Sequence, residues 1–110
     1  MTTLPMDSDN NPIPALTLNP NGAHAINVTS VSARNIAAFE IDTRVISIYA
    51  TDDVFIRFGD TMVTANSTDH FFPKGLYYDF SIGGDKVMHT PYVAVLAANA
   101  DCYLYISEKQ

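Results

Sequence analysis

Hydrophobic and polar residues alternate with a period of two along much of the chain after residue 22, a pattern typical of half-buried β-strands. The clearest case is the stretch 76–82, in which every second residue from Leu76 to Ile82 is large and apolar. We expect these side chains, Tyr78 included, to face the core and Tyr77 to face outward.

Similar patterns recur at short intervals and are separated by Gly, Pro, Asn and Asp residues that favour turns. The residues 61–69, rich in Thr, Asn and Ser, predict a loop with one short strand. The stretch 92–98 is apolar at nearly every position, which is typical of a strand buried on both faces. The further expected strands cover residues 25–31, 36–41, 44–50, 54–58 and 102–107.

These elements predict an all-β fold: a single jelly-roll-like β-sandwich of seven or eight short antiparallel strands. A closed barrel is the alternative architecture. In the last strand, Tyr103 and Tyr105 alternate with apolar residues and therefore face outward, and the chain ends in a polar tail, 108–110. Outward tyrosines are unusual on a solvated sheet and common in the cores of interfaces. They indicate a subunit interface or a binding platform, unless they are isolated surface residues or face a second sheet.

Residues 1–22 form a distinct segment, because they hold four of the six prolines and show little periodicity. Proline removes backbone donors and favours extended conformations, so this segment is expected to form neither a helix nor a central strand. We therefore divide the chain into an extended N-terminal arm, 1–22, and a β-sandwich domain, 23–110. The arm is either a frayed terminus or a docking arm that becomes ordered on a neighbouring subunit.

Composition narrows the classes of partner. The 110 residues are 47% hydrophobic, enough for one core. Twelve acidic and six basic residues give a net charge of −6, which disfavours binding to nucleic acid or to an anionic membrane. The chain has no apolar run of membrane-spanning length and no secretory signal pattern at residue 1, so we expect synthesis in the cytoplasm.

The residues that carry chemistry are few and scattered. Cys102 lies in the inward register of the last strand and is expected to be a small buried hydrophobe. The histidines, His24, His70 and His89, lie far apart and lack the spacing of metal ligands. We therefore expect no enzyme activity, no catalytic residue, no cofactor and no metal.

Five segments together resemble a group of small virion proteins that tailed bacteriophages encode near their head genes. The most specific part is the strand end VFIRFGD at 54–60, followed by a Thr-rich loop and a Pro-x-Gly turn. The resembling segments are 43–51, 54–60, 63–65, 69–75 and 93–96, and the resemblance spans roughly residues 23–107.

This resemblance implies a non-enzymatic capsid cement or decoration protein, a homotrimer on the virion surface that binds the major capsid protein and stabilises its shell. The arm would then reach over a neighbouring subunit. The alternatives are a head spike, a tail component or a host-receptor module that binds glycans through the loops 59–70 and 83–90. The expected interface residues are Pro12, Ile13, Pro14, Leu16, Leu18, Tyr77, Tyr103 and Tyr105.

Overall fold

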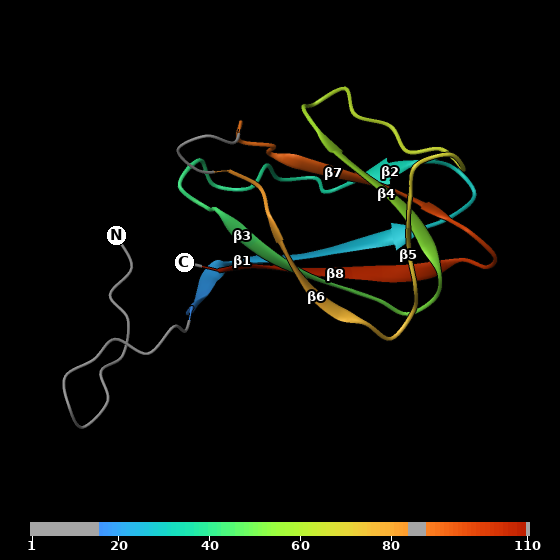
Figure 1. The fold of residues 1–110 in the computed structure, drawn as a ribbon, viewed down its shortest axis with the longest axis horizontal. Coiled ribbons are helices and arrows are strands. Elements are labelled where there is room, and N and C mark those ends of the chain that lie inside the picture. The colour runs from blue at the N-terminus through green and yellow to red at the C-terminus, as the bar shows by residue number, and fades with distance from the viewer. Residues whose placement is uncertain (1–15, 84–87, 110) are drawn as a thin grey trace.

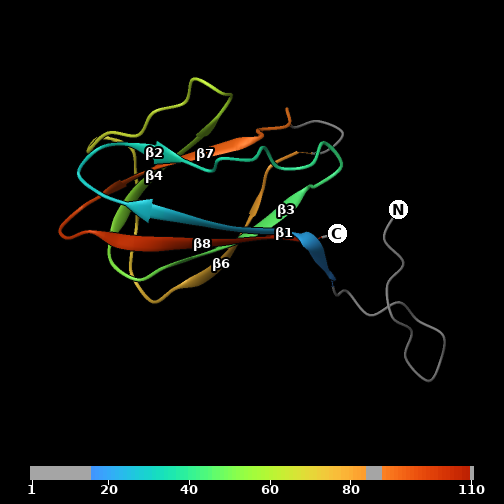
Figure 2. The ribbon, with the colours of Figure 1, turned by 180° about the vertical axis from the view of Figure 1, so that it is seen from behind.

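The computed structural model describes residues 16–83 and 88–109, which form eight strands and no helix. The strands form two antiparallel sheets that pack face to face (Figures 1 and 2). This confirms the all-β prediction and excludes the closed barrel. The strands are β1 (Leu18–Val28), β2 (Ala33–Arg34), β3 (Val45–Ala50), β4 (Val54–Gly59), β5 (His70–Phe72), β6 (Tyr77–Ser81), β7 (Tyr92–Ala97) and β8 (Cys102–Lys109).

Successive strands alternate between the two sheets, except that β4 and β5 pair within one sheet. One sheet has the order β1-β8-β3-β6 and the other the order β2-β7-β4-β5. We call them the first and the second sheet. Because nearly every connection crosses between the sheets, residues far apart in sequence share one core. The start of β1 and the end of β8 lie at the same end of the sandwich, where Leu18 pairs with Lys109.

The core consists of the inward residues of both sheets, as the period of two predicts. On β8, Leu104 and Ile106 are fully buried while Tyr105 between them is exposed. On β7 the middle residues Val93, Ala94 and Val95 are all buried, as predicted for a strand covered on both faces. The buried apolar cluster comprises Ile26, Val28, Phe39, Ile46, Ile48, Ala50, Val54, Ile56, Phe72, Ile82, Val93, Val95, Cys102, Leu104 and Ile106.

The prediction of a strand at 36–41 was wrong. The segment is a loop, in which Phe39 is buried while Ile36 and Ile41 are exposed. Its backbone is held by other partners: the amide of Phe39 donates to the carbonyl of Pro91. The buried Asn35 side chain also donates to the carbonyl of Ala37. Side-chain hydrogen bonds of this kind compete with strand pairing.

Two further differences concern single strands. Leu76 and Tyr78 were expected in the core but are 41% and 52% exposed, because β6 lies at the edge of its sheet, where the second sheet does not cover them. The loop 60–69 contains no strand, and the short strand of this region lies later, at His70–Phe72.

β1 begins at Leu18, inside the segment that we assigned to the arm. Pro20 is accommodated because β1 is an edge strand and its register with β8 shifts between Leu18 and Ala23. Within this bulge, the Asn19 side chain accepts a hydrogen bond from the amide of Asn21 at 3.1 Å. Residues 1–15 of the expected arm lie outside the described residues.

Candidate interaction surface

Four tyrosines share the outer face of the first sheet: Tyr49, Tyr77, Tyr103 and Tyr105, which we call the tyrosine face. Tyr49 lies at its centre, directly opposite Tyr105 on one neighbouring strand and Tyr77 on the other. The Tyr103 and Tyr105 rings stack with their centroids 6.2 Å apart. The four side chains are between 38% and 57% exposed, so one row of rings crosses three strands in solvent.

Beside Tyr103 and Tyr105, the side chains that β1 places on this face are short and uncharged. Ala25 lies opposite Tyr105 on β1, and Asn27 lies opposite Tyr103. Short side chains beside the rings leave the ring faces accessible. A broad, exposed aromatic surface of this kind buries much area at little cost in conformational entropy when a partner covers it.

The charges at one end of the tyrosine face neutralise each other. Lys109 Nζ donates to Asp79 Oδ1 at 3.0 Å and lies 5.1 Å from the centre of the Tyr77 ring. The Ser47 hydroxyl also donates to Asp79, and the hydrogen bonds from Ser47 and Lys109 hold the pKa of Asp79 below its usual value. Burial lowers the pKa of Lys109, but its attraction to Asp79 outweighs this and raises it. Both groups therefore stay ionised and paired at neutral pH.

Tyr77, Tyr103 and Tyr105 were predicted to face outward, and all three lie on this face. Tyr49 was not predicted as part of it, although its alternation with Ile48 and Ala50 indicates the same outward direction. Leu16 and Leu18 are exposed near the start of β1, away from the rings. The remaining expected interface residues, Pro12, Ile13 and Pro14, lie outside the described residues.

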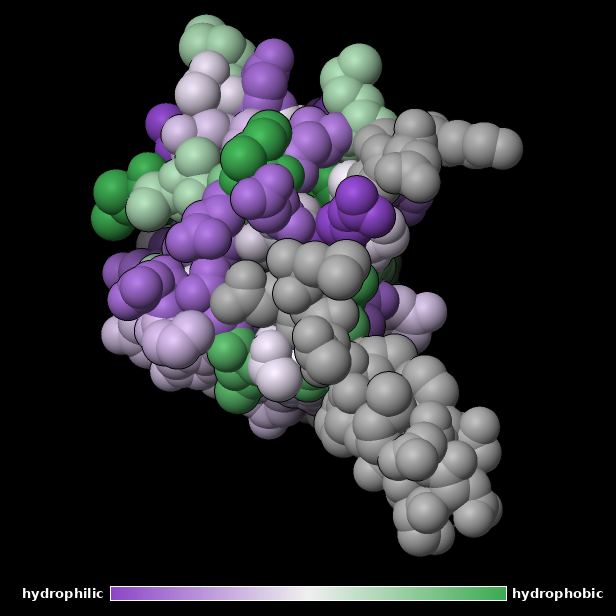
Figure 3. Space-filling model, turned by 90° about the vertical axis from the view of Figure 1, so that its left-hand side faces the viewer, coloured by the Kyte–Doolittle hydropathy of each residue, from purple (hydrophilic) through white to green (hydrophobic). Residues whose placement is uncertain are grey.

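The end of the sandwich where β1 starts offers a weaker surface. Ile36, Ile41 and Met88 are strongly exposed in the loops there. Figure 3 views this end and shows hydrophobic side chains scattered among hydrophilic ones. Outside the grey atoms they do not merge into one patch, as an interface core would require.

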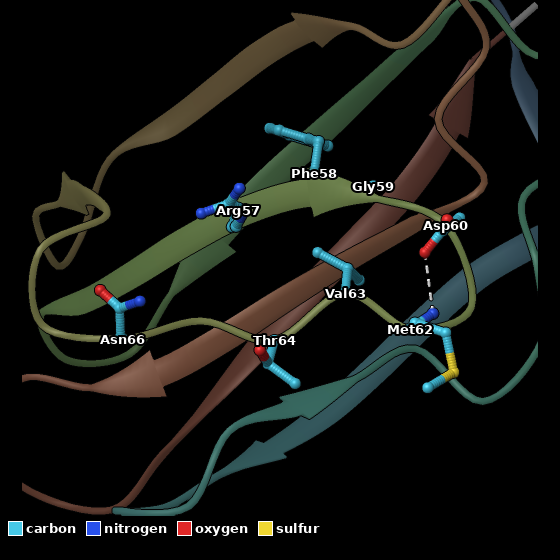
Figure 4. Close-up of a pocket in the computed structure, with 8 residues that line it drawn as sticks. All are labelled: Arg57, Phe58, Gly59, Asp60, Met62, Val63, Thr64 and Asn66. Atoms are coloured by element: carbon cyan, nitrogen blue, oxygen red, sulfur yellow. Dashed lines mark hydrogen bonds between the residues drawn. The ribbon is translucent and has the colours of Figure 1, made fainter.

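A second surface feature is a shallow hollow of about 450 Å³ between β4 and the loop that follows it (Figure 4). Val63 points from the loop toward β4, and a side chain at position 59 would collide with it, since a Cβ there would lie 2.9 Å from Val63 Cβ. Glycine at 59 thus lets the loop lie close to the strand. The lining is Arg57, Phe58, Gly59, Asp60, Met62, Val63, Thr64 and Asn66.

The loop beside the hollow is held by its own polar side chains. Asp60 accepts a hydrogen bond from the amide of Met62, and Asp69 accepts one from the amide of Asn66. Asp69 also pairs with Arg57 at 3.3 Å. These bonds hold the backbone of the loop beside the hollow in place.

A third polar cluster lies inside the fold. Glu108, 2% exposed, is hydrogen-bonded to His24 Nε2 at 2.8 Å, to the Thr43 hydroxyl at 2.7 Å and to the Glu40 amide at 2.8 Å. The sequence analysis missed it, because residues 108–110 were expected to be a polar tail. The His24 side chain is only 10% exposed, and the hydrogen bonds of Glu108 join β1, β8 and the β2–β3 loop.

The residues considered for chemistry have structural partners. Burial raises the pKa of the Cys102 thiol, which opposes formation of the reactive thiolate. Asp53 accepts hydrogen bonds from the Lys74 amide and the Asn99 side chain. Within residues 16–83 and 88–109, no three His, Cys, Asp or Glu side chains are grouped to hold a metal ion.

Comparison of the chain with models of protein families, with curated proteins and with solved structures gave no match. In the part of the chain that the structure describes, no helix is long and apolar enough to cross a membrane. The tyrosine face and the hollow are therefore the two features from which a function can be argued.

Proposed function

We propose that this chain is a structural protein of a tailed-phage virion: a capsid cement or decoration protein that binds the major capsid protein on the outside of the shell. The proposed unit is a homotrimer, made in the bacterial cytoplasm and carried on the capsid surface. Its proposed function is to bind neighbouring subunits of the shell and hold them together. Binding only the assembled, expanded lattice stabilises that state by mass action, and many copies multiply a modest affinity.

The observation that carries the proposal is the tyrosine face. Tyr49, Tyr77 and Tyr105 form a continuous exposed row on a sheet, and two charged residues beside this row, Asp79 and Lys109, are paired with each other. Burying this face leaves no lone charge unsatisfied among those described on it. That is the property a protein partner needs, since unpaired buried charges are costly.

The strand orders β1-β8-β3-β6 and β2-β7-β4-β5 support a finer assignment of the sandwich as a jelly roll. That architecture has eight strands in two sheets and recurs in viral capsid domains and in lectins. Because one architecture serves many functions, it supports the virion proposal only together with the tyrosine face.

The test is co-sedimentation of the purified chain with procapsids and with expanded capsids of the phage that encodes it. We expect saturable binding to expanded capsids only, and a loss of about tenfold or more in affinity for the double variant Tyr77→Ser/Tyr105→Ser. Phe71→Ser is the matched control, because Phe71 is an equally exposed aromatic on the second sheet. Absence of binding, or equal binding by the double variant and the control, would refute the proposal.

The hollow beside β4 favours a second candidate, a head-spike, tail or receptor-binding module that recognises a glycan. Arg57 near the end of β4 and Asp60 and Asn66 on the ordered loop after it offer polar groups, and sugars are bound through such groups. A glycan array probed with the chain and with Asn66→Ala tests this candidate. Binding that Asn66→Ala removes and that Tyr105→Ser leaves intact would favour it over the cement proposal.

A further inference from the structure

The four edge strands of the sandwich differ in how well they are protected against pairing with another chain. Unpaired edges are commonly protected by shortness, proline, bulges or coverage. β2 and β5 have two and three residues. β1 carries Pro20 and a bulge, and it contacts β2 and β7 of the second sheet. Among the described residues, β6 has no proline, no bulge and no covering element, and its one charged residue is Asp79.

β6 lies at the margin of the fold with no strand beyond it in either view (Figures 1 and 2). Its five residues, Tyr77–Ser81, include no proline, lysine or arginine. Its backbone pairs with β3 alone. It reaches the second sheet only through side chains, because the Phe80 ring contacts the Phe58 and Phe72 rings.

The hydrogen-bond pattern shows which backbone groups of β6 face outward. The amide of Ile82 donates to the carbonyl of Arg44, the residue just before β3, and in antiparallel pairs the residues that form such bonds alternate with residues that do not. Tyr78 and Phe80 therefore direct their backbone groups toward β3, in the same alternation as the amide of Ile82. The amides and carbonyls of Tyr77, Asp79 and Ser81 point to the open edge.

Apolar side chains are exposed on both sides of this edge. Tyr77 stands on the outer face, and Leu76 and Tyr78 stand on the inner face, beyond the cover of the second sheet; all three are at least 41% exposed. A strand added here would form hydrogen bonds along the edge and cover apolar surface at the same time.

We propose that β6 pairs antiparallel with β6 of a second copy of this chain, about a two-fold axis at Tyr78, so that the two first sheets become one continuous sheet. In this register each Tyr77 lies opposite Asp79 of the other copy, which forms two hydrogen-bonded residue pairs from the outward backbone groups. Leu76 lies opposite Phe80 on the inner face, and the two Tyr78 side chains meet in a close, non-hydrogen-bonded pair.

Charge disfavours the neighbouring register centred on Asp79 and is compatible with a second copy as the occupant. A two-fold axis at Asp79 would place the two carboxylates directly opposite each other, which is unfavourable. In the register centred on Tyr78, each Asp79 faces a tyrosine and keeps its ion pair with Lys109. The same short segment is thus complementary to itself, as a two-fold interface requires. The contact is separate from the proposed trimer, and when both form, the β6 contact joins two trimers.

The first test is the mass of the chain in solution, measured by light scattering. We expect Asp79→Pro to halve the mass, because proline removes the outward amide of residue 79 without removing a hydrogen bond to β3. Asp79→Ala is the matched control, since it also lacks the carboxylate but keeps the amide, and its mass should equal that of the unchanged chain. An equal mass for all three proteins would overturn the inference, whether or not the chain binds capsids.

The second test does not depend on how well the proline variant folds. Oxidised Tyr78→Cys should form a disulfide-linked dimer, because non-hydrogen-bonded partners lie at a distance that suits a disulfide. Ser81→Cys should not, since the two positions 81 would be about 20 Å apart in this register. The unchanged chain, whose only cysteine is buried, controls for linkage through Cys102. No linkage of Tyr78→Cys, or equal linkage of Ser81→Cys, would overturn the register.

Discussion

Glu108 shows how a charged residue is kept inside a β-sandwich. Burial disfavours its ionised form, but the hydrogen bonds from His24, Thr43 and the Glu40 amide outweigh this and hold the pKa of Glu108 below its ordinary value of 4.5. The carboxylate is therefore ionised and satisfied in the folded chain. Because its three partners come from different segments, the residue links parts of the chain that are distant in sequence.

This arrangement predicts an acid-sensitive stability. A carboxyl group whose pKa is lower in the folded than in the unfolded chain stabilises the fold above the unfolded pKa, here about 4.5, and this stabilisation is lost as the pH falls through the folded pKa. We expect Glu108→Gln to cost about 1–3 kcal/mol at neutral pH and to flatten the loss of stability below that pH. Urea unfolding between pH 7 and pH 3 measures both effects.

Asp101→Asn is the control for that experiment, because it removes one negative charge from an exposed site. A pH profile of Glu108→Gln parallel to that of the unchanged chain would show that Glu108 does not contribute to the acid sensitivity.

The buried position of Glu108 follows from the alternation of Cys102, Leu104 and Ile106. This alternation was not extended to Glu108 in the prediction, because a buried carboxylate is unfavourable without hydrogen-bond partners. Those partners come from distant parts of the chain and cannot be seen in the local pattern.

At the scale of the strand, the bulge in β1 depends on a close approach between Gly22 and β8. A Cβ on Gly22 would lie 2.6 Å from Glu108 Cβ and 3.0 Å from Asn19 Cβ. Glu108 is held by its three hydrogen bonds and has little freedom to move. The bulge therefore needs glycine at this position, because a side chain would push β1 away from β8.

We expect Gly22→Ala to destabilise the chain by about 1–3 kcal/mol through overpacking. Asn21→Ala, an exposed position of the same bulge, should change stability by no more than about 0.5 kcal/mol. Chemical denaturation of the three proteins gives the comparison. Equal stabilities of the two variants would contradict the steric argument.

The elements that were predicted correctly are those in which local pattern and burial agree. β3, β4, β7 and β8 lie close to their expected positions, since each has neighbours on both sides in its sheet. The segment 36–41 has a strand-like alternation, but its amides are bonded to Pro91 and Glu108 rather than to a strand. The alternation correctly predicted that Tyr78 lies on the inner face of its sheet. It could not predict that Tyr78 is exposed there, because the pattern does not show how far the opposite sheet extends.

At the scale of the whole molecule, Cys102 belongs to the core that the two sheets share, is 7% exposed and pairs through its backbone with Val28. Its thiol should react with DTNB only when the sandwich opens. We expect the reaction to be about 100-fold or more slower in the folded chain than in guanidinium. It should accelerate about tenfold for each 1.4 kcal/mol by which a variant is destabilised.

Stopped-flow labelling of the unchanged chain and of Gly22→Ala measures this dependence. A rate that does not change in the destabilised variant would show that Cys102 is reached by a local opening of β8 instead.

Of the candidate surfaces, the outward tyrosines were predictable because alternation fixes the face of each residue. The hollow beside β4 was not, because it depends on how the loop after Gly59 folds back along the strand.

The pairing of Leu18 with Lys109 at one end of the sandwich sets the direction in which the molecule is mechanically weak. A force that pulls the start of β1 away from the end of β8 acts on the hydrogen bonds between these two strands one residue pair at a time. The bonds therefore break in sequence. A force applied across the sheet faces is shared by many contacts at once. A protein built this way withstands load through its broad faces and yields when it is tethered by its two ends.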